Sequence, residues 1–115
     1  MDQTPNLGLP FVAAAQAQKH VTHNEALRVL DALVQLAVLD DDRTAPPAAP
    51  ADGDRHLVAA AASGAWAGHS GHVAAFQDGA WMFFAPREGW VIWVAALYRS
   101  RVFDGTDWIA YGDRE

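Results

Sequence analysis

The first half of the chain places its apolar residues at the spacing of an amphipathic helix. Leu27, Leu30, Val34 and Val38 follow one another at intervals of three and four. In a helix these positions form one continuous apolar stripe, and Asp31 falls on the other, polar face. The spacing therefore predicts a helix over residues 22–38.

The ends of this predicted helix carry their own signals. Thr22 followed by Glu25 fits a capping box, in which each side chain bonds a backbone amide at the helix start. The acidic run at 40–42 disfavours a longer helix, because its carboxylates would lie at the negative end of the helix dipole. Residues 1–20 are rich in turn formers and predict an arm, whereas the proline-rich stretch 43–54 predicts a stiff, polyproline-like connector.

The second half repeats a cassette made of a strand, a turn built on Gly, and Trp. The cassette occurs at residues 62–66, 77–81 and 103–108. Gly supplies the positive φ of tight hairpin turns, and Trp favours a half-buried pleated surface. These cassettes predict antiparallel β structure over residues 55–112.

The turns of the second and third cassettes predict strand registers. The third cassette fits a four-residue loop at 104–107, which pairs Phe103 with Trp108, or a two-residue turn, and we favour the loop. A two-residue turn at 78–79 predicts four cross-strand pairs. These are Phe76 with Trp81, Ala75 with Met82, Ala74 with Phe83, and Val73 with Phe84.

The amount of apolar strand surface suggests that the chain binds another polypeptide. Residues 90–98 are apolar at both odd and even positions, which predicts a strand covered on both faces. A helix of about 15 residues covers roughly half of one face of a four-stranded sheet. We therefore expect an α+β fold, with the arm and one amphipathic helix packed on a small antiparallel sheet or a partly open barrel. Residues 21–115 would form this single domain. Self-association would cover the apolar sheet surface that the helix leaves exposed.

Composition narrows the classes of partner. The 115 residues carry a net charge of −6, so direct nucleic-acid binding is not expected. The absence of cysteine removes disulfides and thiolate metal sites, and no apolar run is long enough to predict a membrane span. We expect a protein made in the cytoplasm that does not contact membranes.

Candidate catalytic and metal-binding residues are few. His20 and His23 lie three apart, whereas two metal-binding histidines on one helix lie four apart. Aspartates flank Gly53 and Gly105, where short acidic side chains shape turns. We expect no catalytic residues, no metal and no cofactor, so the chain is not predicted to be an enzyme.

Aromatic residues raise an alternative function. Exposed Trp side chains stack on sugars in many carbohydrate-binding modules, although Trp after a hairpin turn normally packs over its own sheet. Trp66 lies in a Gly-rich stretch and is the Trp most expected to be exposed. With His69 and His72 it forms the candidate glycan contact.

Several segments resemble a domain of unknown function found in prophages and bacterial gene transfer agents. The most specific segment is residues 16–27, Gln-Ala-Gln-Lys-His-Val-Thr-His-Asn-Glu-Ala-Leu. Residues 4–11, 50–55, 64–68 and 86–90 extend the resemblance over nearly the whole chain. In gene transfer agents, a short protein of this kind is similar to the base of the head spike on the capsid vertex.

The resemblance implies a structural adaptor that attaches a receptor-binding fibre to the capsid of a phage-like particle. Its expected partners are the capsid protein, the spike fibre protein and further copies of itself, five of which would match the symmetry of a vertex. Residues 11–18 fit both an extended segment and a helix. The arm is expected to make the partner contacts, through Leu7, Leu9, Phe11, Val12, Gln16 and Gln18. The alternative is a carbohydrate-binding module that contacts host surface polysaccharide.

Overall fold

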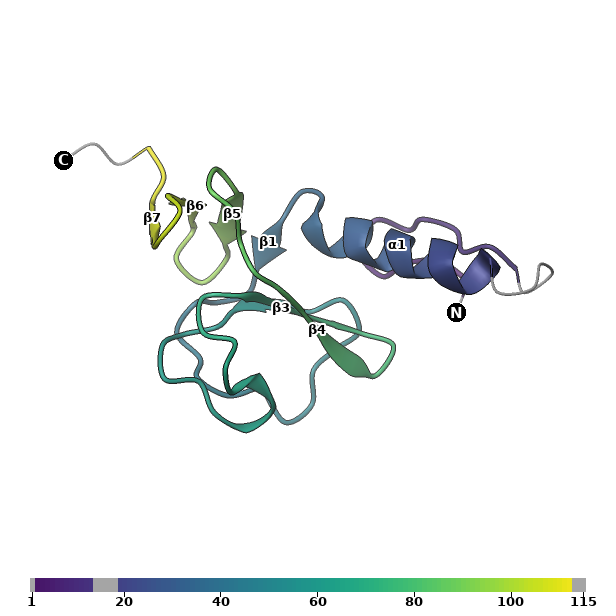
Figure 1. Cartoon of the computed structure of the whole chain (residues 1–115), viewed down its shortest axis with the longest axis horizontal. Coiled ribbons are helices and arrows are strands. Elements are labelled where there is room, and N and C mark those ends of the chain that lie inside the picture. Colours follow the sequence, from purple (N-terminus) through teal and green to yellow (C-terminus); the bar gives the residue numbers. More distant parts are fainter. Residues whose placement is uncertain (1, 14–18, 113–115) are drawn as a thin grey trace. The chain divides into compact units, whose positions relative to one another are not determined.

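The computed structural model describes residues 2–13 and 19–112 of the chain (Figure 1). The chain divides into two compact units, residues 1–34 and residues 35–115. The fold is α+β, as predicted, with one α-helix in the first unit and strands in the second. The strands form two small sheets that do not close into a barrel.

The first unit contains helix α1, which spans Lys19–Leu33. The predicted bounds of 22–38 were wrong at both ends. The helix begins before Thr22, so the expected capping box does not mark its start. It ends before Gln35, whose φ of 54° belongs to the left-handed region in which many helices terminate.

The second unit contains a four-stranded sheet with the order β1-β5-β6-β7. Strand β1 spans Ala37–Val38 and pairs in parallel with β5, Val91–Val94. The sheet is therefore mixed, and its first strand comes from a segment that we predicted to be helical. Strands β6, Arg99–Phe103, and β7, Trp108–Ala110, continue it in antiparallel fashion.

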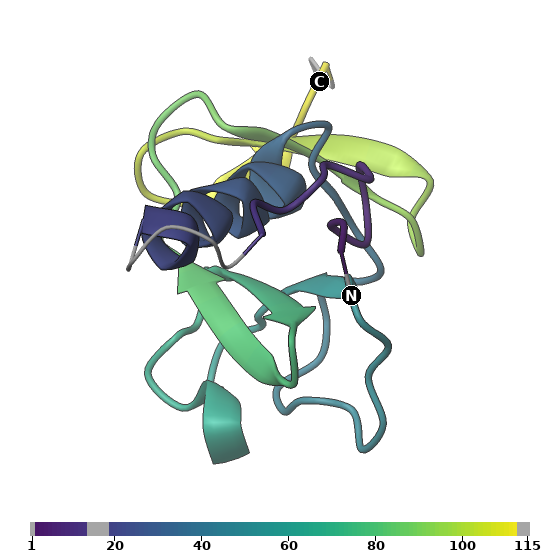
Figure 2. The same ribbon diagram turned by 90° about the vertical axis from the view of Figure 1, so that its right-hand side faces the viewer.

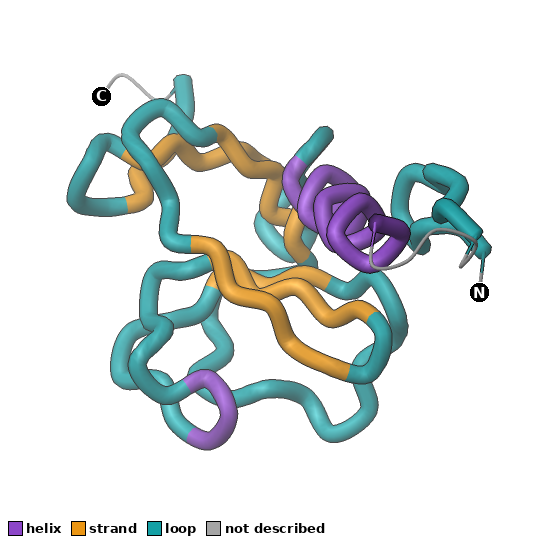
Figure 3. Tube along the Cα trace, turned by 45° about the vertical axis from the view of Figure 1, so that its right-hand side comes forward, coloured by secondary structure: helices purple, strands orange, loops and turns teal. Residues whose placement is uncertain are grey.

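A three-stranded antiparallel sheet completes the second unit, and both sheets are visible as orange strands in Figure 3. It consists of β2, Arg55–Leu57, β3, Val73–Gln77, and β4, Ala80–Phe84. The hairpin of β3 and β4, green in Figure 2, has the four predicted cross-strand pairs. Asp78 and Gly79 both have positive φ, as a type I′ turn requires.

The third cassette also has the favoured register, since Phe103 pairs with Trp108. The loop is held by Asp104, whose carboxylate accepts hydrogen bonds from the amides of Thr106 and Asp107 at 2.8 Å each. These bonds stabilise the ionised form and lower the pKa of Asp104. The first cassette was predicted wrongly, because residues 64–66 form a single 3-10 turn, η1, Gly64–Trp66, with no strand directly before it.

The core of the second unit lies on both faces of β3. Successive residues of this strand point to opposite faces and belong to two different clusters. On one face Val73 packs in a cluster with residues of the four-stranded sheet, namely Val38, Ile92 and Val94, and with Leu57. The opposite face places Ala74 in a second cluster with Val58 and Trp66. The first of these clusters joins the two sheets.

Candidate functional site

The strand registers gather apolar side chains on one face of the four-stranded sheet. Val91 pairs with Val102, which in turn pairs with Ile109, so these three side chains form a row across β5, β6 and β7. Trp93 pairs with Ser100 in a second row on the same face. The amide of Tyr111 donates to the carbonyl of Ser100 and extends this second row past β7. We call the surface formed by Val91, Trp93, Ser100, Val102, Ile109 and Tyr111 the outer sheet face.

The outer sheet face is accessible, whereas the opposite face of the same strands is closed. Val91 is 43% exposed, Trp93 37% and Ile109 44%, but the intervening Ile92 and Val94 are fully buried. The chain itself therefore covers only one face of this segment, and the expected cover of the other face by a second polypeptide stays a prediction. A contiguous group of exposed apolar side chains is typical of a binding surface.

One end of the outer sheet face is extended by an aromatic pair. Tyr98 is 83% exposed, and its ring meets that of Trp93 edge to face at a centroid distance of 4.9 Å. Next to it lies an open groove with a volume of about 230 Å³. The residues that line this groove are Tyr98, Arg99, Ser100, Ala110, Tyr111 and Gly112.

Trp66, the central residue of the predicted glycan contact, does not lie on the surface. Its side chain is fully buried, so the prediction of an exposed Trp66 was wrong. The ring meets Trp81 edge to face at 5.2 Å and lies 5.3 Å from the ring of His56. The Gly-rich sequence around Trp66 gave no sign of these contacts, which come from β2 and β4.

His69 and His72, the other two predicted glycan residues, do lie together. Their Nδ1 atoms are 3.1 Å apart, and the His69 ring stacks on Phe83 at a centroid distance of 3.6 Å. Partial burial lowers the pKa of His72, and the neighbouring His69 lowers it further. Because one Nδ1 must accept while the other donates, this contact requires that at least one ring is neutral.

The N-terminal segment with the predicted partner residues is bonded to α1 within the first unit. The amide of Val12 donates to the side chain of Asn24 at 2.8 Å, and the Asn24 side chain donates back to the Val12 carbonyl at 3.0 Å. The guanidinium of Arg28 lies 4.6 Å from the centre of the Phe11 ring. Leu7 and Val12 are each 39% exposed. Leu9 is half-buried, and Gln16 and Gln18 lie outside the described residues.

Asp31 is the residue of this unit that the sequence analysis misplaced. It was assigned to the solvent-facing side of the helix, as its charge suggests, but it is fully buried. Its two carboxylate oxygens accept hydrogen bonds from the amide of Asn6 at 2.9 Å and from the amide of Leu7 at 2.6 Å. The carboxylate thus fixes the turn of the N-terminal segment to α1.

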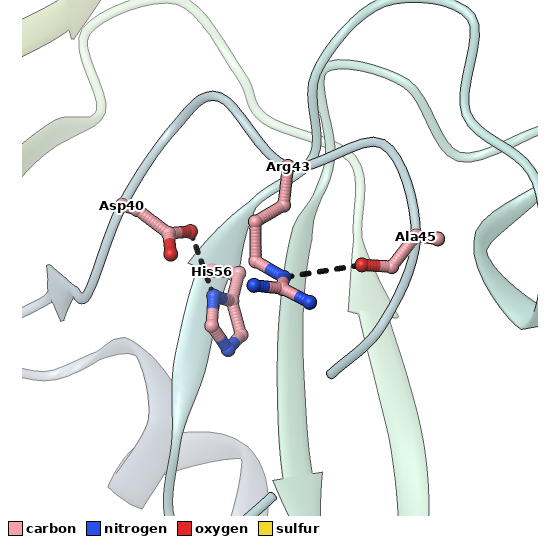
Figure 4. A network of polar contacts seen from close by, with 4 residues as sticks. All are labelled: Asp40, Arg43, Ala45 and His56. Atoms are coloured by element: carbon pink, nitrogen blue, oxygen red, sulfur yellow. Dashed lines mark hydrogen bonds and ion pairs between the residues drawn. The ribbon is translucent and has the colours of Figure 1, made fainter. Parts of the chain in front are cut away.

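A second polar contact missed from the sequence lies within the second unit (Figure 4). His56 of β2 is buried, and its Nδ1 lies 2.8 Å from the carboxylate of Asp40. The side chain of Arg43 donates to the carbonyl of Ala45 at 3.2 Å and holds the start of the connector (Figure 4). The acidic run after the helix thus binds strand β2, although its sequence pattern indicates only a helix end.

The acidic pairs beside glycines have structural contacts. The carboxylate of Asp52 accepts from the amide of Asp78 at 3.1 Å, and that of Asp54 accepts from the amide of Ala51 at 2.9 Å. Within residues 2–13 and 19–112, no group of three or more His, Asp or Glu side chains could hold a metal ion. No helix among these residues is long and apolar enough to cross a bilayer.

Comparison of the sequence with known protein families identifies a family without an assigned activity. A family model described as "Protein of unknown function (DUF2793)" matches residues 23–109. The chain belongs to this family. The match includes most of α1 and all strands of the second unit except the last residue of β7, and therefore the outer sheet face apart from Tyr111. No curated protein matches the chain.

Proposed function

We propose that this DUF2793 protein is a structural adaptor of a phage-like particle, the base of a head spike that attaches a receptor-binding fibre to the capsid. The observation that carries the proposal is the outer sheet face, an exposed apolar surface of the four-stranded sheet. The assignment to a phage-like particle rests on the segments of the sequence that resemble gene transfer agent proteins.

The chemistry of the outer sheet face suits a protein partner. Its two rows contain aliphatic and aromatic residues and a serine, but no ionisable group except the Tyr111 phenol. The centres of protein interfaces are likewise depleted in charge and enriched in aromatic residues. Trp93 and Tyr111 have the large, stiff side chains that often contribute most to binding free energy.

The proposed assembly has two kinds of partner besides further copies of the chain. The capsid protein would bind one surface and the spike fibre protein another, with the chain made in the cytoplasm and incorporated into the particle. The adaptor would catalyse no reaction and would need neither metal nor cofactor. The outer sheet face is the candidate surface for one of the two particle contacts.

Particle recruitment tests this function directly. Trp93→Glu and Ile109→Glu each place a charge on the outer sheet face, and each is expected to lower the amount of the chain in purified particles at least tenfold. That loss corresponds to about 1.4 kcal/mol or more per substitution, as expected for residues that an interface buries. Ala48→Glu is the matched control, because Ala48 is exposed on the connector.

The two face variants must retain the circular dichroism spectrum of the wild type, so that misfolding is not read as lost binding. Normal recruitment of both folded variants would remove the outer sheet face from the particle contacts. Loss of recruitment in Ala48→Glu as well would show that added charge, rather than the face, is responsible.

The groove beside Tyr98 favours a second candidate function, a carbohydrate-binding module. Tyr98 and Tyr111 offer aromatic surfaces in the groove, and Arg99 and Ser100 bring polar groups to it. Titration of the chain with host capsule polysaccharide distinguishes the two functions. Saturable binding that is lost in Tyr98→Ala would support the glycan module, whereas an adaptor shows no saturable binding.

A further inference from the structure

Residues 69–72 form a turn with a histidine at each end, and we call this segment the histidine turn. The amide of His72 donates to the carbonyl of His69 at 3.0 Å, which closes the turn. Gly71 has a φ of 81°, as the third residue of a type II turn requires. The turn leads directly into β3, which begins at Val73.

The two histidine side chains add a second bond across this turn. Their Nδ1 atoms lie 3.1 Å apart, so one ring donates a hydrogen bond and the other accepts it. In the described part of the chain, no third His, Asp or Glu joins the pair in a group that could hold a metal ion. The His69 ring also stacks on Phe83 of β4. The conformation of the turn therefore depends on a hydrogen bond between two titratable groups.

The same turn is bonded to β7 of the four-stranded sheet. The indole Nε1 of Trp108 donates to the carbonyl of Gly71 at 2.9 Å. Trp108 packs against the core cluster of Val73, whereas Ile109, the next residue of β7, lies on the outer sheet face. Because β7 is the last strand of its sheet and spans only Trp108–Ala110, the bond to Gly71 helps to hold this strand in place.

Solvent reaches the histidine turn through an open pocket of about 300 Å³. Residues 70–72 of the turn line this pocket together with Gly105 and Thr106 of the loop that precedes β7. The pocket gives protons access to His72. It also leaves room for the turn to move away from Trp108.

A protonated His72 has no carboxylate partner among the residues that line this pocket. The lining segments other than the turn are residues 84–90 and 103–108, and their ionisable residues are Arg87, Glu88, Asp104 and Asp107. None of these four lines the pocket itself. Burial lowers the pKa of His72, and the charge of His69 lowers it further. A second positive charge on the pair is therefore poorly compensated.

The first proton taken up by the pair leaves its hydrogen bond intact, whereas the second removes it. The Nδ1–H of a protonated ring can still donate to the Nδ1 of a neutral ring. When both rings are protonated, both Nδ1 atoms are donors and the two positive charges repel each other. No hydrogen bond between the Nδ1 atoms is then possible.

We propose that the histidine turn is a pH-sensitive latch between the two sheets of the second unit. Uptake of the second proton breaks the bond between His69 and His72, opens the turn and withdraws the Gly71 carbonyl from Trp108. Strand β7 then loses a bond that holds its first residue. The latch follows from these contacts and does not depend on the adaptor function.

The indole N–H signal of Trp108 reports the latch in ¹H–¹⁵N spectra of the full chain, and Trp108→Phe identifies it among the five tryptophans. Between about pH 7.5 and about pH 5, we expect this signal to move towards the position of a free indole. Its midpoint should match that of the His72 ring signals and lie below the ordinary value of 6.5. The indole of Trp66, which is buried in the same unit, should keep its position and serves as the reference for folded protein.

His72→Gln tests the cause of the shift, because a Gln side chain can accept from His69 at every pH and takes up no proton. The Trp108 signal should then stay at its neutral-pH position throughout. His69→Gln is the second variant, with the same expectation, and the circular dichroism spectrum shows which variants are folded. His23→Gln, at an exposed position of α1, is the matched control and should retain the wild-type shift.

Three results would overturn the latch. They are a wild-type Trp108 signal that does not move over this pH range, a shift that persists in a folded Gln variant of the pair, and a simultaneous change of the Trp66 and Trp108 signals, which indicates global unfolding. The adaptor function is measured separately, by recruitment of the Trp93 and Ile109 variants to particles. Either inference can therefore fail while the other stands.

Discussion

Replacing Asp31 by Ala is expected to release the N-terminal segment from α1. The fully buried carboxylate accepts from the amides of Asn6 and Leu7 at 2.9 and 2.6 Å, and Ala offers no acceptor to either. Asp31→Asn keeps the size of the side chain and one acceptor oxygen. The two variants thus remove these hydrogen bonds in graded steps.

The expected loss can be worked out from these two contacts. A hydrogen bond to a charged acceptor contributes about 1.5–3 kcal/mol, so two bonds set an upper range of about 3–6 kcal/mol. Water can reach the amides once the segment moves, and the burial cost of the carboxylate disappears with it. We therefore expect Asp31→Ala to cost about 2–4 kcal/mol in the stability of the docked segment, and Asp31→Asn about half of this.

Amide hydrogen exchange measures this loss at the residues concerned. At about 1.4 kcal/mol for each factor of ten, the amides of Asn6 and Leu7 should exchange at least roughly 30-fold faster in Asp31→Ala than in the wild type. Glu25→Ala is the matched control, because Glu25 is an exposed acidic residue of the same helix. Wild-type exchange at Asn6 and Leu7 in Asp31→Ala would refute the structural role assigned to Asp31.

Three further predictions concern the histidine pair, the core and the N-terminal segment. The folded chain lowers the pKa of His72 below its ordinary value of 6.5, so the unfolded chain binds the proton more readily. The free energy of unfolding should therefore fall as pH drops below about 6.5. His72→Gln should weaken that dependence in urea titrations at several pH values, and an unchanged dependence would exclude the pair as its source. Trp66→Ala, at a fully buried position, should cost about 3–5 kcal/mol in the same assay, and a loss below about 1 kcal/mol would contradict its place in the core. Deletion of residues 1–18 should reduce recruitment to particles if the N-terminal segment binds a partner, and normal recruitment would count against this contact.

The hairpins could be predicted from the sequence because their determinants are local. Asp78 and Gly79 adopt the positive φ values of a type I′ turn, and that turn alone sets the register of β3 and β4. The loop at 104–107 likewise depends on the side chain of Asp104 and its own neighbours. Such elements need no information from distant parts of the chain.

The errors arose where distant residues decide the structure. Val34 and Val38 continue the helical spacing, but Val38 belongs to β1 because it pairs with Val94, far along the chain. Asp31 carries a charge that usually indicates a surface position, and only the amides 24 and 25 residues before it explain its burial. Trp66 was expected at the surface because the contacts with His56 and Trp81 that enclose it are not visible in its local sequence.

The sequence predicted the candidate site only in part. Excess apolar strand surface was recognised from residues 90–98, but its location required the alternation of buried and exposed residues in β5. The registers with β6 and β7 then showed which side chains share the exposed face. The sequence therefore indicated an excess of apolar strand surface, and the sheet identified the exposed residues that form it.

Site-specific photo-cross-linking from position 93 in assembled particles tests the adaptor proposal most directly. A photoreactive phenylalanine derivative in place of Trp93 would lie on the outer sheet face, and the same group at Ala48 would lie on the exposed connector. We expect position 93 to form a covalent adduct with a capsid or fibre protein and position 48 to form none. Particles that contain the chain but yield no adduct from position 93 would contradict the proposal.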